Sequence, residues 1–153
     1  MTQLHVEAEG RASAAPEVLW ALLADAESYC RWGPWSMACY ESKGDESAGG
    51  VGAVRRLKLG RTTVVERVEE VDPPRRLVYC VVKGMPVRNY RAEVSITPTA
   101  EGARVHWSAT WDRTLVGRLV QRQLRSLYPQ AVQGLISAAE ARGAAPGVAT
   151  SHI

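Results

Sequence analysis

The feature of this sequence that most constrains its fold is a change of hydrophobic period at residue 115. Before this point, apolar and polar side chains alternate in short segments separated by turn-forming residues, which is the pattern of half-buried β-strands. From Leu115 to about Gly143, apolar residues recur every three to four positions, as in an amphipathic helix. The sequence therefore predicts an antiparallel sheet whose apolar face packs against one long C-terminal helix.

The expected elements follow from the same patterns. A first strand over residues 4–12 is followed by a helix that begins near Pro16 and by a second short helix from Asp25 to Gly33. Six further strands are expected at residues 36–42, 52–59, 62–71, 76–83, 87–97 and 103–113. This predicts an α+β fold in which a curved seven-stranded antiparallel sheet wraps around the long helix. We expect one domain over residues 1–143 and a disordered tail over residues 144–153.

Composition excludes several classes of protein. With 153 residues, 46% hydrophobic and 23% charged, the chain resembles an ordinary globular domain, and a net charge of +3 does not by itself indicate nucleic-acid binding. No apolar stretch approaches the ~20 residues of a membrane span, and no basic-then-apolar leader begins the sequence, so we expect a cytoplasmic protein. Three cysteines without a C-x-x-C pair, and three histidines without ligand spacing, predict free thiols, no metal site and no cofactor.

A hairpin centred on Gly60 places an arginine opposite a glutamate. Glycine at the first central position suits a two-residue type II′ turn, and the resulting register pairs Leu57 with Val64 and Arg55 with Glu66. Because side chains alternate between faces, the pair points into an otherwise apolar face. Such a pair is either a structural bridge or a polar group inside a ligand cavity.

The inward side chains of the other strands favour a cavity. A single helix cannot fill the concave side of a curved sheet, and large aromatic residues there alternate with small alanines. The expected lining is Leu57, Tyr79, Val81, Tyr90, Trp107 and Trp111, with Trp32 and Trp35 at the mouth. A filled core of the same composition, with the tryptophans only packing, is the alternative.

Two stretches resemble a known superfamily. Residues 14–25, followed by Tyr29 and Trp32, and residues 71–77 resemble the helix-grip superfamily, which includes pollen-allergen-like proteins, START lipid-transfer domains and bacterial polyketide cyclase/dehydrase-like (SRPBCC) proteins. The similarity covers about residues 3 to 142. It implies the helix-grip fold and the binding of a small hydrophobic, polyketide- or lipid-like metabolite.

A narrower resemblance concerns the cavity. Residues 53–55, 66–72, 77–79 and 88–91 are similar to segments of lachrymatory factor synthase and the plant abscisic-acid receptors. The resemblance implies that Arg55, Glu66, Tyr79 and Tyr90 are pocket residues, with proton transfer in the synthase and water-mediated ligand contact in the receptors. The receptors' Ser-Gly-Leu-Pro-Ala gate is absent, because Gly60 and Arg61 form too short a turn, and their carboxylate-binding lysine has no clear counterpart.

Three functions remain open at this stage. Burial would raise the pKa of Glu66 and a contacting arginine would lower it. If burial dominates, Glu66 could transfer protons with Arg55 and Tyr90 in a cofactor-independent cyclisation or dehydration. If Arg55 dominates, Glu66 stays ionised and the pair only orients a ligand or a bound water. The second function is a non-catalytic carrier or sensor of an apolar ligand. A co-chaperone-like interaction module is the third reading.

A basic stripe marks the expected long helix. Arg118, Arg122 and Arg125 recur at helical spacing, and Arg113 precedes them. The stripe could dock an acyl carrier protein or a membrane surface, or it could be a solvated helix face. The sequence does not decide the oligomeric state.

Overall fold

A seven-stranded antiparallel sheet and a long helix form the part of the protein covered by the computed structural model, residues 2–44 and 49–143. The elements in chain order are β1 (Gln3–Ala12), α1 (Pro16–Leu23), η1 (Ala26–Ser28), α2 (Tyr29–Trp32), β2 (Met37–Ser42), β3 (Val54–Leu59), β4 (Thr62–Asp72), β5 (Arg76–Lys83), β6 (Arg91–Thr99), β7 (Gly102–Asp112) and α3 (Leu115–Gly143). This confirms the predicted helix-grip architecture. The tail expected to be disordered lies outside the described residues.

The strand order is β1-β7-β6-β5-β4-β3-β2. Strands β2 to β7 therefore form the expected meander, in which consecutive strands are neighbours. β1 closes the far edge by pairing with β7, with Gln3 opposite Asp112 and Ala12 opposite Ala103. Local patterns do not determine this long-range pairing.

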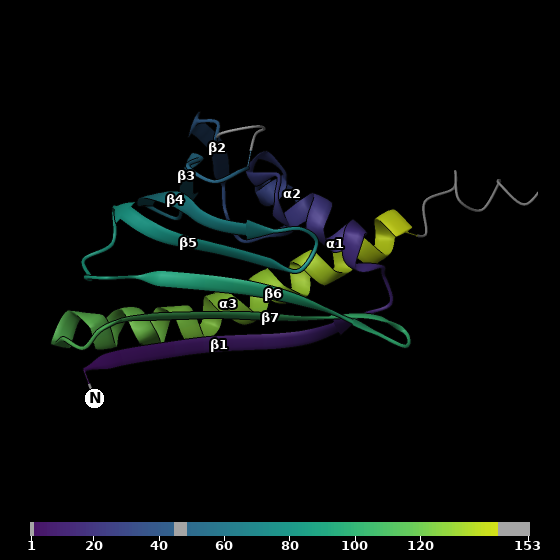
Figure 1. Cartoon of the computed structure of the whole chain (residues 1–153). Helices are drawn as coiled ribbons and strands as arrows, with labels where there is room; N and C mark the ends of the chain where they lie inside the picture. The colour runs from purple at the N-terminus through teal and green to yellow at the C-terminus, as the bar shows by residue number, and fades with distance from the viewer. Residues whose placement is uncertain (1, 45–48, 144–153) are drawn as a thin grey trace, which may run out of the picture.

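Helix α3 lies along only part of the sheet. It packs against β1 and β7 and also contacts α1 and α2, whereas β2 and β3 turn away from its axis (Figure 1). Gly134 allows the close approach of α2, because a Cβ atom there would lie 1.9 Å from the carbonyl oxygen of Trp32. The space beneath β3, β4 and β5 is consequently left for the candidate site.

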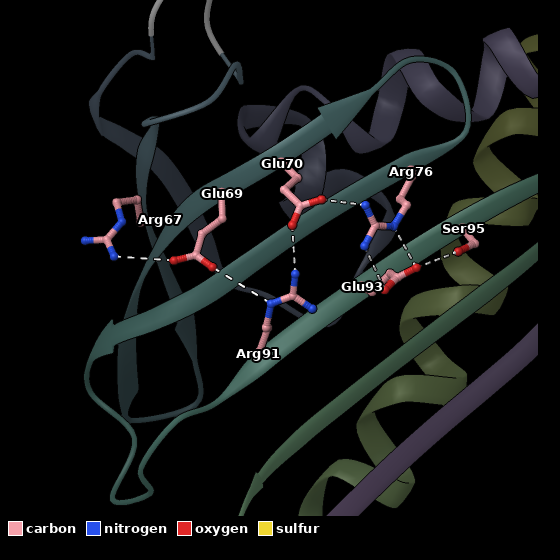
Figure 2. Close-up of polar contacts among 7 residues, drawn as sticks. All are labelled: Arg67, Glu69, Glu70, Arg76, Arg91, Glu93 and Ser95. Atoms are coloured by element: carbon pink, nitrogen blue, oxygen red, sulfur yellow. Dashed lines mark hydrogen bonds and ion pairs between the residues drawn. The ribbon is translucent and has the colours of Figure 1, made fainter.

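The opposite face of the sheet carries a network of ion pairs, shown in Figure 2. Arg76 on β5 joins Glu70 on β4 (2.6 Å) to Glu93 on β6 (2.9 Å), and Arg91 donates to the second oxygen of Glu70 at 2.9 Å. These pairs are half-exposed and join three neighbouring strands, β4, β5 and β6. Among the aliphatic side chains on this face of β5, that of Val78 is nevertheless buried. The charged residues assign this face to solvent and leave the other face for the apolar core.

The structure confirms the predicted hairpin and corrects two boundaries. Leu57 pairs with Val64 and Arg55 with Glu66, and Gly60 has a φ of 61°, as the first central residue of a type II′ turn requires. The strand expected from residue 87 begins at Arg91 instead, because Asn89 adopts a φ of 58° that breaks the extended chain. The short helix expected from Asp25 is a 3-10 turn, capped by the Asp25 side chain, followed by the four-residue α2.

Candidate functional site

The hairpin formed by β3 and β4 brings Arg55 and Glu66 into direct contact. Arg55 Nη2 lies 3.0 Å from Glu66 Oε1, and Arg55 Nε donates to the same oxygen at 3.1 Å. Arg55 is 1% exposed and Glu66 8%. The hydrogen bond from Nε and the ion pair of Nη2 both use the same carboxylate oxygen, so Glu66 Oε2 has no contact among the described interactions.

Arg55 is enclosed by tyrosines behind the glutamate. Its guanidinium carbon lies 4.6 Å from the ring centre of Tyr79 and 5.2 Å from that of Tyr29. Arg55 Nη1 also donates to the Tyr29 hydroxyl at 2.9 Å, and that hydroxyl donates to the carbonyl of Leu23 at 2.6 Å. The arginine is therefore held by stacking and by a hydrogen-bond chain that ends on the helix α1 backbone.

Burial decides the direction of the Glu66 pKa. Removal from water raises the pKa of the carboxyl above its ordinary value of 4.5, and the charge and hydrogen bonds of Arg55 oppose this rise without cancelling it. Burial and the contact with Arg55 act on the pKa of Glu66 in opposite directions, and in the structure the effect of burial is the larger. A carboxyl group with a raised pKa can both accept and return a proton closer to neutral pH.

Glu66 borders a cavity of about 550 Å³ between the sheet and α3. This volume lies within the range of small-molecule sites. The lining is mainly apolar and aromatic and consists of Trp35, Leu57, Leu59, Thr62, Val64, Glu66, Tyr79, Gly84, Met85, Pro86, Tyr90, Trp107, Val120, Gln123, Leu124, Leu127, Tyr128 and Ala131.

The exposed part of the lining shows where the cavity opens. Thr62 at the hairpin tip, Gly84 and Pro86 in the loop between β5 and β6, and Gln123 on α3 are exposed, whereas the rest of the lining is half-buried or buried. We call the gap among these residues the mouth. Gly84 is required there, because its φ is 102° and a Cβ atom would lie 2.1 Å from the carbonyl oxygen of Thr63.

Three tyrosines give the cavity hydrogen-bonding capacity. Trp107 Nε1 donates to the Tyr79 hydroxyl at 3.0 Å, and the hydroxyls of Tyr90 and Tyr128 are hydrogen-bonded to each other. Burial raises the pKa of all three phenols, so they stay protonated, and the nearby charge of Glu66 contributes to the rise for Tyr79 and Tyr90. A side-chain hydrogen bond between Tyr79 and Tyr128 also contributes to the raised pKa of Tyr128. The three hydroxyls therefore form one cluster, in which at least one O–H proton is uncommitted. The cavity thus offers at least one phenol donor to a ligand oxygen.

The structure brings most of the predicted site residues to one cavity. Glu66, Tyr90, Tyr79, Trp107, Trp35 and Leu57 all border it. Arg55, Val81, Trp111 and Trp32 do not.

The four residues outside the lining have other surroundings. Trp111 is fully buried, stacks on Tyr90 and donates to the carbonyl of Gly117 at 3.1 Å. Trp32 donates to the Ser28 hydroxyl at 3.0 Å. Val81 lies opposite Glu66 in the pairing of β4 with β5, and Arg55 lies behind two lining residues, Glu66 and Tyr79. The functional roles assigned to all of these side chains remain predictions.

Two important tyrosines were missed as site residues at the sequence level. Tyr128 falls four residues after Leu124 and three before Ala131, so helical spacing alone could have placed it on the cavity side of α3. Tyr29 gave no such signal, because its contact with Arg55 joins residues that are 26 positions apart.

Other kinds of site have little support in the described part of the chain. No group of three or more His, Cys, Asp or Glu side chains is arranged there to hold a metal ion. Cys30, Cys39 and Cys80 are free thiols. No helix among these residues is both long and apolar enough to cross a bilayer.

Comparison with known proteins identifies the family. Residues 3–140 match the family described as "Polyketide cyclase / dehydrase and lipid transport". The chain therefore belongs to this family, whose description, together with the fold, supports the binding of a hydrophobic ligand. Among curated proteins, none matches the sequence.

Solved structures support the same fold. The protein XoxI from Bacillus cereus is 21% identical, with a TM-score of 0.70 over 90% of this chain and 95% of its own. A protein from Nitrosospira multiformis is 16% identical, with a TM-score of 0.71 over 88% and 94%. An uncharacterized protein from Bacillus thuringiensis is 22% identical, with a TM-score of 0.67 over 88% and 98%. At these identities the likeness concerns the fold alone.

Proposed function

We propose that the protein binds a small polyketide- or lipid-like metabolite in its internal cavity and catalyses a cofactor-independent cyclisation or dehydration. The observation that carries this proposal is the position of Glu66, whose buried carboxyl borders an otherwise mainly apolar cavity and has one oxygen without a contact among the described interactions. A purely apolar carrier would gain nothing from a glutamate there, because burial of a carboxyl group is costly.

The proposed chemistry begins with proton abstraction. The ionised Glu66 removes a proton from a carbon next to a ligand carbonyl, and the electron pair of that C–H bond forms the enolate. The O–H group left uncommitted in the cluster of Tyr79, Tyr90 and Tyr128 donates to the enolate oxygen and stabilises its charge. Arg55 acts through Glu66, by holding Oε1 so that Oε2 faces the ligand.

Two outcomes of the enolate are open to this site. In a dehydration, the enolate expels a β-hydroxyl group, which leaves as water with the proton that Glu66 returns. In an aldol-type closure, the enolate carbon attacks a second carbonyl of the same ligand, and Glu66 returns the proton to the new alkoxide. Each sequence conserves atoms and electrons and needs no oxidant or reductant.

The test compares Glu66→Gln with Glu69→Gln. Glu69 lies on the same strand but belongs to the ion-pair network of the solvent face, so its replacement is a matched control. Native mass spectrometry of the wild-type protein purified from its own host should reveal a bound apolar molecule. Glu66→Gln should bind that molecule with similar affinity but lose turnover by at least about 10²-fold, whereas Glu69→Gln should keep both.

The opposite results separate the alternatives. A carrier or sensor would show binding without turnover in the wild-type protein, and Glu66→Gln would change affinity or nothing. If no adduct forms and no polyketide or lipid from a panel stabilises the protein, the cavity is not a ligand site and the interaction-module reading replaces the proposal. We also propose that an acyl carrier protein delivers the ligand. Turnover of the free ligand and of the carrier-bound ligand, measured side by side, tests this.

A further inference from the structure

The arginines of the basic stripe surround a hollow at the beginning of α3. Arg113, Arg118, Arg122 and Arg125 line it together with Leu4 and Gln121. None of the four arginines forms an ion pair with any of the described residues, although the arginines of the solvent face of the sheet are paired with glutamates. Four unpaired guanidinium groups around one hollow form a concentrated site for anions.

Exposed aliphatic side chains lie next to this hollow. Leu115 is 84% exposed, Leu119 59% and Val116 45%, which is unusual for residues of this size in a helix that buries most of its other apolar residues. Leu115 and Leu119 are separated by one helical turn and lie beside Arg118 and Arg122. We call these three apolar residues and the four arginines the docking face.

The docking face leads to the mouth of the cavity. Leu115, Leu119, Gln123 and Leu127 follow each other at intervals of four, so they form one row along the surface of α3. The first two are exposed, Gln123 lies at the mouth, and Leu127 lines the cavity. A surface that received the leucines would therefore lie next to the entrance of the ligand site.

We propose that this face docks on a lipid bilayer that contains anionic headgroups. Lipid phosphates would bind the arginines, and Leu115, Val116 and Leu119 would enter the boundary between headgroups and acyl chains. The observations favour a bilayer over an acidic protein, because the leucines protrude singly from a helix end and the adjoining hollow is lined mainly by arginines. The hollow therefore offers no apolar groove for a partner helix. The proposal does not depend on which ligand the cavity holds or whether it is converted.

Vesicle co-sedimentation tests the charge requirement. Wild-type protein should bind vesicles of phosphatidylcholine mixed with phosphatidylglycerol, bind phosphatidylcholine alone much more weakly, and lose binding as salt rises. Each arginine near an anionic surface contributes a factor of about five, so R118Q/R122Q/R125Q should lower the partition coefficient on the order of a hundredfold. The control R11Q/R31Q/R142Q removes the same charge from exposed residues elsewhere and should cause a much smaller loss.

A second pair of variants tests insertion. L115S/L119S should lower binding to the anionic vesicles at least about tenfold, because both leucines would leave water on docking. V51S removes an exposed aliphatic side chain outside the docking face and should bind like the wild type. All these positions are exposed, so thermal unfolding should be unchanged.

Three results would overturn the proposal. Equal losses in the two arginine triples would show a net-charge effect without a docking face. Unchanged binding of L115S/L119S would show that no apolar side chain enters the bilayer. Absence of vesicle binding, with saturable binding of an acidic acyl carrier protein to the same face, would assign the face to a protein partner.

Discussion

The central residue-scale feature is the unequal situation of Arg55 and Glu66. Arg55 is fully enclosed and makes stacking and hydrogen-bond contacts with Tyr29 as well as its contact with Glu66. Glu66 borders the cavity, and burial raises its pKa. The pair is therefore a fixed arginine that positions a glutamate able to change its protonation state.

This asymmetry predicts how stability depends on pH. Because the folded-state pKa of Glu66 lies above its ordinary value of 4.5, the folded protein binds more protons than the unfolded chain between these two values. The wild-type protein should therefore lose stability relative to Glu66→Gln as pH rises from about 4.5 through the folded-state pKa. The loss is about 1.4 kcal/mol for each pH unit of that window. Thermal unfolding of both proteins across this range measures the difference.

The opposite slope would contradict the account. If the wild-type protein gains stability over Glu66→Gln as pH rises, Arg55 holds the pKa of Glu66 below its ordinary value and the carboxylate stays ionised. The pair would then be a structural bridge, whose one-sided removal costs about 3–5 kcal/mol.

Sequence reasoning at this scale depended on local register. The single glycine turn placed Arg55 opposite Glu66 correctly, because a two-residue loop fixes every pair that follows it. The same reasoning could not show that Arg55 lies behind the glutamate, outside the cavity lining. That placement depends on Tyr29, which the fold brings to Arg55 from another part of the chain.

At the scale of the elements, the loop between β5 and β6 shapes the mouth of the cavity. Gly84 combines a φ of 102° with a backbone contact that leaves no space for a Cβ atom, whereas Gly60 has a φ of 61° and nothing within 4 Å. Gly60→Ala should therefore cost only backbone strain, about 1–3 kcal/mol. Gly84→Ala adds overpacking against Thr63, about 1–3 kcal/mol more, and displaces the mouth. Thermal unfolding and ligand affinity measure both effects.

Equal melting temperatures for the two glycine variants would contradict this interpretation. We expect Gly60→Ala to keep ligand affinity close to that of the wild type, because the hairpin tip has free space around it. Gly84→Ala should lower both affinity and melting temperature.

The elements themselves were largely predictable, with instructive exceptions. Alternation and turn residues located the strands, but the strand expected from residue 87 begins at Arg91. Asn89 adopts a left-handed conformation there, and its side chain donates to Asp112 at 2.9 Å. A residue pattern does not reveal this contact between the end of β7 and the loop that joins β5 to β6. Asparagine tolerates this conformation better than most residues, so Asn89 was the one sequence signal that the strand could break there.

At the scale of the whole molecule, the cavity is a consequence of topology. α3 packs against β1 and β7 at one edge of the sheet, so the concave side beneath β3 to β5 is not filled by the helix (Figure 1). The sequence predicted that one helix would leave a space. It did not predict the extent of that space or the entry of Tyr128 into its wall, because both depend on how α3 lies across the sheet.

The measurement that tests the account most directly is a titration with the neutral apolar probe N-phenyl-1-naphthylamine, followed by its fluorescence. Leu127→Trp enlarges a side chain in the cavity lining, and Leu119→Trp makes the same change two helical turns away on the outer surface of α3. The account predicts saturable binding to the wild type and to Leu119→Trp, and binding at least about tenfold weaker to Leu127→Trp. Equal binding by all three proteins, or no saturable binding by the wild type, would contradict the claim that the internal cavity is the ligand site.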